Sequence, residues 1–153
     1  MTKSILFLCT GNYYRSRFAE ILFNHMASKM GLAWTADSKG LALERGINNI
    51  GPLETSAQTA LATLGIHPDE AWTRFPSPVT NVDLERADLI IALKQDEHLP
   101  LLQERFPGWE ERAEFWHIDD GPGVLPLLEQ EVRRLMERLE RFDVNQKCTR
   151  DPA

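Results

Sequence analysis

The stretch SILFLCTGNYYRS, residues 4–16, determines which fold class the chain can adopt. It opens with a short apolar run that ends at Cys9, and a Gly-Asn turn signal follows closely. A short apolar run bounded in this way indicates a buried β-strand. From Ser16 onward, apolar side chains recur at positions 18, 22, 26 and 30, which is typical of one face of an amphipathic helix. The stretch therefore predicts a strand, a loop and a helix in succession.

The same alternation continues along the chain. We expect further strands over residues 32–38, 87–93 and 112–118, and further helices over residues 54–64, 94–105 and 125–142. Residues 73–81 are expected to form a loop and residues 145–153 a frayed tail. Strands that alternate with helices predict an α/β fold, a three-layer sandwich in which helices flank both faces of a parallel sheet. Ligands of such sheets bind beyond the carboxyl ends of the strands, where residues 9–16 lie.

Length and composition narrow the class of protein. The 153 residues suffice for one globular domain, and we assign residues 1–153 to a single domain. The net charge of −6 argues against general nucleic-acid binding, which favours a basic surface. We expect neither a signal peptide at the start nor a membrane span, because the apolar runs are short. With two cysteines, one near each end, we expect free thiols and a cytoplasmic location.

Residues 9–16 have the composition of an anion site. A loop between a buried strand and a helix N-terminus directs several backbone N–H groups at one point, and the helix end adds about half a positive charge. Gly11 lets the backbone curl around an oxyanion, and Asn12 tolerates a left-handed conformation. Arg15 offers a planar guanidinium that matches two oxygens of a phosphate. We therefore expect these residues to bind a phosphate group, and we call them the phosphate loop.

Cys9 lies at the base of the phosphate loop. A free thiol has a pKa of about 8.5, and lowering such a pKa by about three units takes about 4 kcal/mol. A helix dipole supplies only about 0.3–1 kcal/mol, so loop N–H groups, Arg15 and a hydroxyl donor such as Ser16 must supply the rest. A lone cysteine after a buried strand is usually only a small apolar side chain. The combination of strand, Cys-x5-Arg-Ser and helix is much more specific, and it predicts a thiolate nucleophile.

The motif Cys9-Thr-Gly-Asn-x-x-Arg15-Ser16 after an apolar strand resembles the low-molecular-weight protein tyrosine phosphatases. Three further stretches match the family: ADSKG at residues 36–40, ADLIIAL at residues 87–93 and WHIDDG at residues 116–121. The resemblance implies a four-stranded parallel sheet flanked by helices. It also implies a metal-independent phosphomonoesterase without a cofactor, a protein tyrosine phosphatase that forms a cysteinyl-phosphate intermediate. The implied substrate is a phosphorylated protein or a small aryl phosphate.

The resemblance also assigns roles to residues. Cys9 would attack phosphorus, Arg15 would hold the equatorial oxygens, and Asp120 would protonate the leaving oxygen and then activate water. The substrate site would further comprise Thr10, Gly11, Asn12, Tyr13, Tyr14 and Ser16, and the bracing residues would be Asn12 and Ser38. The family's acid segment reads roughly Ile-Pro-Asp-Pro. Aligning Ile118 with its isoleucine favours Asp120 as the acid, with Asp119 as the alternative, and either carboxylate also suits a helix cap.

Four departures from the family pattern stand out. Gly121 replaces a proline, Lys94 replaces an acidic residue of many members, and Tyr14 replaces a second cysteine. The aromatic residues that often follow the acid are missing, since GPGVL at residues 121–125 has none. Tyr13 either lines the pocket mouth, where it would stack on a substrate ring, or only packs, and for Tyr14 we expect packing. Without a second thiol in the loop, an oxidised Cys9 has no disulfide partner there.

Two other functions remain open from the sequence. One is an arsenate reductase that uses an external small thiol, which needs only Cys9 on the same scaffold. The other is a non-catalytic module that binds phosphate or a phosphoprotein, although binding alone needs neither a thiol nor an acid. The four histidines show no metal-ligand spacing, so no metal site is expected. Among them, His98 is expected on a solvent-exposed helix.

Overall fold

A sheet of four parallel strands runs through the middle of the computed structural model, which describes residues 2–150 and the side chains of residues 2–143. The strands are β1 (Lys3–Cys9), β2 (Trp34–Gly40), β3 (Leu89–Ala92) and β4 (Ala113–Phe115). Their order is β2-β1-β3-β4, and every neighbouring pair is parallel. The predicted α/β architecture with a four-stranded parallel sheet is confirmed.

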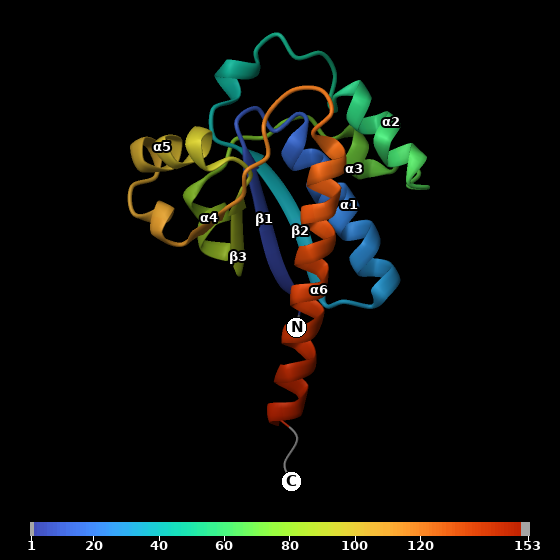
Figure 1. The fold of residues 1–153 in the computed structure, drawn as a ribbon. Coiled ribbons are helices and arrows are strands. Elements are labelled where there is room, and N and C mark those ends of the chain that lie inside the picture. Colours follow the sequence, from blue (N-terminus) through green and yellow to red (C-terminus); the bar gives the residue numbers. More distant parts are fainter. Residues whose placement is uncertain (1, 151–153) are drawn as a thin grey trace.

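Helices cover both faces of the sheet (Figure 1). On one face, α1 (Arg15–Met30) lies beside α6 (Leu125–Arg150), and α2 (Thr55–Thr63) and α3 (Glu70–Thr73) pack into the same core. On the other face lie α4 (Asn81–Arg86) and α5 (Gln95–Arg105). Two 3₁₀ turns cover Leu43–Gly46 and Trp109–Glu111.

The two cores meet at β1, which supplies side chains to both. Ile5, Phe7 and Cys9 point into the core under α1 and α6, whereas Leu6 and Leu8 point into the core under α4 and α5. Side chains of a strand alternate between faces, so a central strand covered on both sides must be apolar throughout. This explains the continuous apolar run and places Cys9 where β1 ends.

Several element bounds differ from the sequence-based expectations. Strand β2 is shifted by two residues, because it pairs with β1 from Trp34 opposite Lys3 to Gly40 opposite Cys9. Its buried side chains alternate with exposed ones, and Ser38 is among the buried ones. Strands β3 and β4 are shorter than expected. The buried face of β2 ends in Ser38 and Gly40 rather than in large apolar side chains, which explains why apolar character alone misplaced the strand.

The helices also differ in detail. Helices α3 and α4 were not expected, since each is too short for a periodic apolar pattern. A capping box between Thr80 and Asp83 begins α4, within the stretch expected to be a loop. Helix α6 continues to Arg150, although residues 145–153 were expected to fray, and residues 151–153 lie outside the described part. Within residues 2–150, no helix combines the length and apolar character that crossing a membrane requires.

Candidate active site

The phosphate loop joins the carboxyl end of β1 to the first turn of α1 (Figure 1). Asn12 has a φ of 52°, in the left-handed region that asparagine tolerates better than most residues. This turn directs the Asn12 backbone N–H at the Cys9 sulfur, across 3.3 Å from N to Sγ. The loop therefore curls around the thiol, as an anion-binding loop does.

Cys9 is a free thiol that is only 3% exposed, and its sulfur lies 2.9 Å from the Ser16 Oγ. The Asn12 amide Nδ2 donates a hydrogen bond of 2.9 Å to the same Ser16 oxygen. Since that oxygen already accepts a bond, the Ser16 hydroxyl proton is available for the sulfur. A backbone N–H therefore donates to the sulfur, and a hydroxyl that is able to donate lies within hydrogen-bond distance of it.

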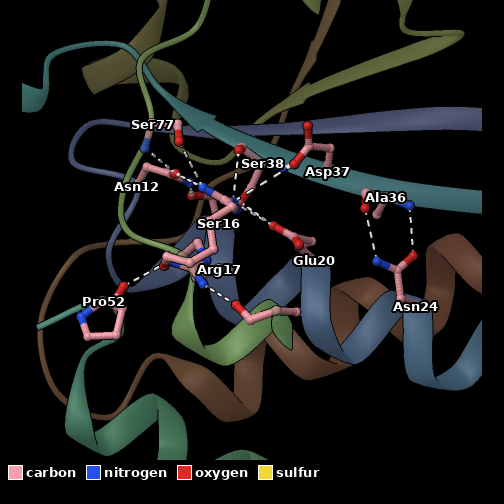
Figure 2. A network of polar contacts seen from close by, with 12 residues as sticks. Asn12, Ser16, Arg17, Glu20, Asn24, Ala36, Asp37, Ser38, Pro52 and Ser77 are labelled. Carbon is pink, nitrogen blue, oxygen red and sulfur yellow. Dashed lines mark hydrogen bonds and ion pairs between the residues drawn. The ribbon is translucent and has the colours of Figure 1, made fainter. Parts of the chain in front are cut away.

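Behind the loop, a buried network fixes the Asn12 side chain (Figure 2). Its Nδ2 donates to the Ser38 Oγ at 2.9 Å, and its Oδ1 accepts from the Ser77 backbone N–H and from Arg74. Ser38 donates in turn to Glu20 at 2.6 Å, and Arg74 forms an ion pair with Glu20 at 2.9 Å. Burial raises the pKa of Glu20, although the Ser38 bond and the Arg74 charge oppose this. The network holds the left-handed turn from β2, α1 and the segment before α4.

Arg15 lies in the loop wall with its guanidinium in a fixed orientation. Its Nη1 donates to the Ile118 carbonyl at 2.9 Å, and its Nη2 donates to Glu97 Oε1 at 2.9 Å. Its Nε lies 3.7 Å from Asp120 Oδ1. The side chain is 3% exposed, so these partners compensate for burying a charge. Arg15 thereby connects the phosphate loop to α5 and to residues 118–121, which we call the acid segment.

The two aspartates of the acid segment have different surroundings. Asp119 Oδ1 forms an ion pair of 2.6 Å with Lys94 Nζ, and this hydrogen bond and the Lys94 charge lower the pKa of Asp119. Asp120 instead lines a cavity of about 710 Å³ together with Cys9 and Arg15. The geometry therefore places Asp120 in the wall of the cavity that also contains the thiol, and it pairs Asp119 with Lys94.

A family model described as low molecular weight phosphotyrosine protein phosphatase matches residues 4–145. The chain belongs to this family. The family and the phosphatase enzyme class predicted from the sequence are confirmed.

Individual relatives agree with the family assignment. The chain is 31% identical to the protein-arginine-phosphatase of Bacillus subtilis over 109 residues, which cover 71% of this chain and 67% of that protein. It is 37% identical to the low molecular weight protein-tyrosine-phosphatase YfkJ of Bacillus subtilis over 92 residues, 59% of this chain and 55% of that protein. The crystal structure of YfkJ superimposes with a TM-score of 0.76 at 23% identity, covering 92% of this chain and 96% of that chain.

Glu97 and His98 belong to the site of this phosphatase, although the sequence analysis missed both. Thr10 donates its hydroxyl to Glu97, which also accepts the Arg15 bond. His98 is fully buried, which corrects the expected exposed position. Its Nδ1 accepts from the Lys94 N–H at 3.0 Å, so the neutral ring donates from Nε2 to Thr10, 3.2 Å away. Burial lowers the pKa of His98 to about 4. Glu97 and His98 follow shortly after β3, at the edge of the sheet where ligands bind, and this position was the sequence signal that could have identified them.

The two tyrosines of the phosphate loop both line the cavity. The Tyr13 hydroxyl donates to the Ile50 carbonyl at 2.5 Å, and the Tyr14 hydroxyl donates to the Gly121 carbonyl at 3.1 Å. Tyr14 is therefore more than a packing residue, since it joins the phosphate loop to the acid segment. Gly11 also lines this cavity.

Arg17, a second arginine in the first turn of α1, is not among the residues that line the cavity. It is buried and donates to backbone carbonyls of Pro52, Ala71 and Arg74. Burial, reinforced by the nearby Arg74 charge, lowers its pKa to about 10. Among the described side chains, no group of three or more His, Cys, Asp or Glu residues is placed to hold a metal ion.

Proposed function

We propose that this chain is a protein tyrosine phosphatase that cleaves aryl phosphate esters through a phosphocysteine on Cys9, without a metal. The observation that supports this most directly is the convergence of three groups on one cavity. The Cys9 thiol, the Arg15 guanidinium and the Asp120 carboxylate all line it. A binding module needs neither the thiol nor the carboxylate, whereas phosphoryl transfer through a covalent intermediate needs both.

In the proposed first step, the Cys9 thiolate attacks phosphorus in line with the ester bond. A phosphorus–sulfur bond forms and the phosphorus–oxygen bond to the substrate breaks. The Asp120 carboxyl gives its proton to the leaving oxygen. Arg15 and the N–H groups of the phosphate loop stabilise the charge on the equatorial oxygens, because they are fixed in place before the substrate arrives.

In the proposed second step, the Asp120 carboxylate takes a proton from water, and this water attacks phosphorus. The phosphorus–sulfur bond breaks and Cys9 leaves as a thiolate. Ser16 donates to the departing sulfur, since its hydroxyl lies 2.9 Å from it and its oxygen is already held by Asn12. The network from Asn12 to Ser38 and Glu20 keeps this donor in place.

We infer that phosphotyrosine in a protein is the substrate. Tyr13 and Tyr14 in the cavity wall offer aromatic surface to a phenyl ring, and Pro122 adds apolar surface. Phosphoarginine in a protein is the second candidate, because a relative with 31% identity is named protein-arginine-phosphatase. We place the enzyme in the cytoplasm, since Cys9 must stay reduced to act.

The test is hydrolysis of an aryl phosphate near pH 6 with a chelator present. We expect turnover by the unsubstituted protein, none by Cys9→Ser and a large loss in Asp120→Asn. Asp119→Asn is the comparison variant and should lose far less activity than Asp120→Asn. An inert protein that binds phosphate would support the binding module, and arsenate reduction with a small thiol would support the reductase. Phosphotyrosine and phosphoarginine forms of one peptide, compared by kcat/KM, distinguish the two substrates.

A further inference from the structure

The acid segment is held at three points around Asp120. Arg15 donates to the Ile118 carbonyl, Lys94 pairs with the Asp119 carboxylate, and Tyr14 donates to the Gly121 carbonyl. The three anchors come from α1, from the residue before α5 and from the phosphate loop. Asp120 lies between them, with a side chain that is 71% exposed and 3.7 Å from Arg15 Nε. Its neighbours are therefore fixed, while its carboxylate projects into the cavity.

The sequence of the acid segment makes such anchors necessary. Gly121 has a φ of 112°, and a Cβ built there would meet no atom within 4 Å, so packing does not restrain this residue. Glycine also loses more conformational freedom on ordering than any other residue. Neither Asp119 nor Gly121 is a proline, whose ring would have fixed φ at both sides of the acid. An unanchored segment of this composition would let the Asp120 carboxylate sample many positions.

We propose that Tyr14 and Lys94 are positioning residues that hold the acid segment so that Asp120 reaches the leaving oxygen, an inference that rests on the proposed function. It gives one physical reason for the departures from the family pattern at four positions. A glycine and an aspartate stand where prolines flank the acid in relatives, and a tyrosine and a lysine supply restraint through hydrogen bonds instead.

The chemistry of both anchors suits this role. Burial raises the pKa of Tyr14, so its phenol remains protonated and donates throughout the neutral range. The hydrogen bond to Asp119 raises the pKa of Lys94, so the ammonium stays charged over the same range. Lys94 also binds the carboxylate that would otherwise compete with Asp120 for the leaving oxygen. Both anchors therefore act on the acid without contacting the phosphorus.

The experiment compares kcat/KM for two aryl phosphates, because this ratio reports on cleavage of the ester bond. Phenyl phosphate has a poor leaving group and needs the acid, whereas dinitrophenyl phosphate has a good one and needs it little. With phenyl phosphate, we expect Tyr14→Phe to lower kcat/KM by about 3- to 10-fold and Lys94→Met by about 2- to 5-fold. With dinitrophenyl phosphate, we expect less than about a twofold change from either.

One variant background, one rescue variant and two controls test whether the role is specific. In an Asp120→Asn protein, neither Tyr14→Phe nor Lys94→Met should lower kcat/KM further, because the acid that Tyr14 and Lys94 position is absent. Lys94→Arg should restore most of the activity that Lys94→Met loses. Tyr13→Phe removes the neighbouring hydroxyl, which bonds Ile50, and should affect both substrates equally. Arg133→Gln breaks an exposed ion pair on α6 and should leave both rates unchanged.

Four results would overturn the inference. Equal losses on both substrates, or further losses in the Asp120→Asn background, would show that Tyr14 and Lys94 act elsewhere. Unchanged rates in Tyr14→Phe and Lys94→Met would show that the anchors are dispensable. If the unsubstituted protein hydrolyses neither substrate, the proposed function fails and the inference fails with it. Thermal unfolding of each variant confirms that it is folded at the assay temperature.

Discussion

Replacing Glu97 by glutamine tests how Arg15 is held in the phosphate loop. Glu97 Oε1 accepts from Arg15 Nη2 at 2.9 Å and also from the Thr10 hydroxyl. Glutamine has nearly the same shape and keeps one carbonyl acceptor, but it carries no charge. The substitution therefore weakens the orientation of the guanidinium without opening a cavity. We expect slower phosphoryl transfer by a protein that is still folded.

The size of the expected loss in kcat/KM follows from the surroundings of the Arg15–Glu97 pair. Arg15 is 3% exposed and Glu97 is 32% exposed, so solvent screens the bond only from the glutamate side. A hydrogen bond between charged groups contributes about 1.5–3 kcal/mol, which corresponds to about 10- to 150-fold in rate at 1.36 kcal/mol per tenfold. Because glutamine retains a neutral acceptor, we expect a loss of kcat/KM near the lower bound, about 10-fold.

The pH dependence of this loss is also predicted. Burial favours the neutral carboxyl of Glu97, but hydrogen bonds from Arg15 and Thr10 and the Arg15 charge outweigh it and lower the pKa to about 2. The carboxylate is therefore charged throughout the assay range, and the loss should be the same at about pH 5 and at about pH 7. Asp96→Asn removes an exposed carboxylate from the same helical turn and is the matched control. Equal kcat/KM for Glu97→Gln and the control would refute this account of Arg15.

Three further predictions concern stability and the second chemical step. Arg74→Met leaves the buried Glu20 carboxylate without its partner, so we expect the free energy of unfolding in urea to fall by about 2–4 kcal/mol; a loss below about 0.5 kcal/mol would contradict the role of the network. Because His98 has a folded-state pKa of about 4 and an unfolded histidine has a pKa of about 6.5, the unfolded chain takes up this proton first as the pH falls. The free energy of unfolding should therefore drop by about 3 kcal/mol from pH 6.5 to pH 4, and His98→Gln should flatten that slope; an unchanged slope would exclude His98 as the cause. Ser16→Ala removes the donor to the departing Cys9 sulfur, so rapid quenching should show slower breakdown of the phosphocysteine by about 10-fold, whereas breakdown at the normal rate would exclude this role.

The local parts of the site could be predicted from the sequence. Cys9, Arg15 and Ser16 lie within one loop, and the strand before it and the helix after it determine how that loop is built. The alternation of strands and helices also predicted the sheet, because apolar β1 is readable by composition alone. In a short motif the local backbone determines how the side chains are placed, so the motif can be interpreted without knowing the rest of the fold.

The remaining parts depend on contacts between distant residues. Arg74 reaches Asn12 across 62 positions, and Glu97 reaches Arg15 across 82. Neither belongs to a local motif, and the position of Glu97 just after β3 did not by itself show that it contacts Arg15. The anchoring of Gly121 by Tyr14 is likewise visible only once the two loops are side by side. Long-range pairing of polar side chains is therefore what the structure adds.

The proposed mechanism requires that Cys9 carry the phosphoryl group during turnover. The direct measurement is rapid acid quenching during hydrolysis of an aryl phosphate, followed by mass spectrometry of the peptides. We expect one phosphoryl group on the peptide that contains Cys9, and none in the Cys9→Ser protein, which should also be inactive. Turnover by Cys9→Ser, or turnover by the unsubstituted protein with no phosphorylated Cys9 peptide at any time point, would contradict it.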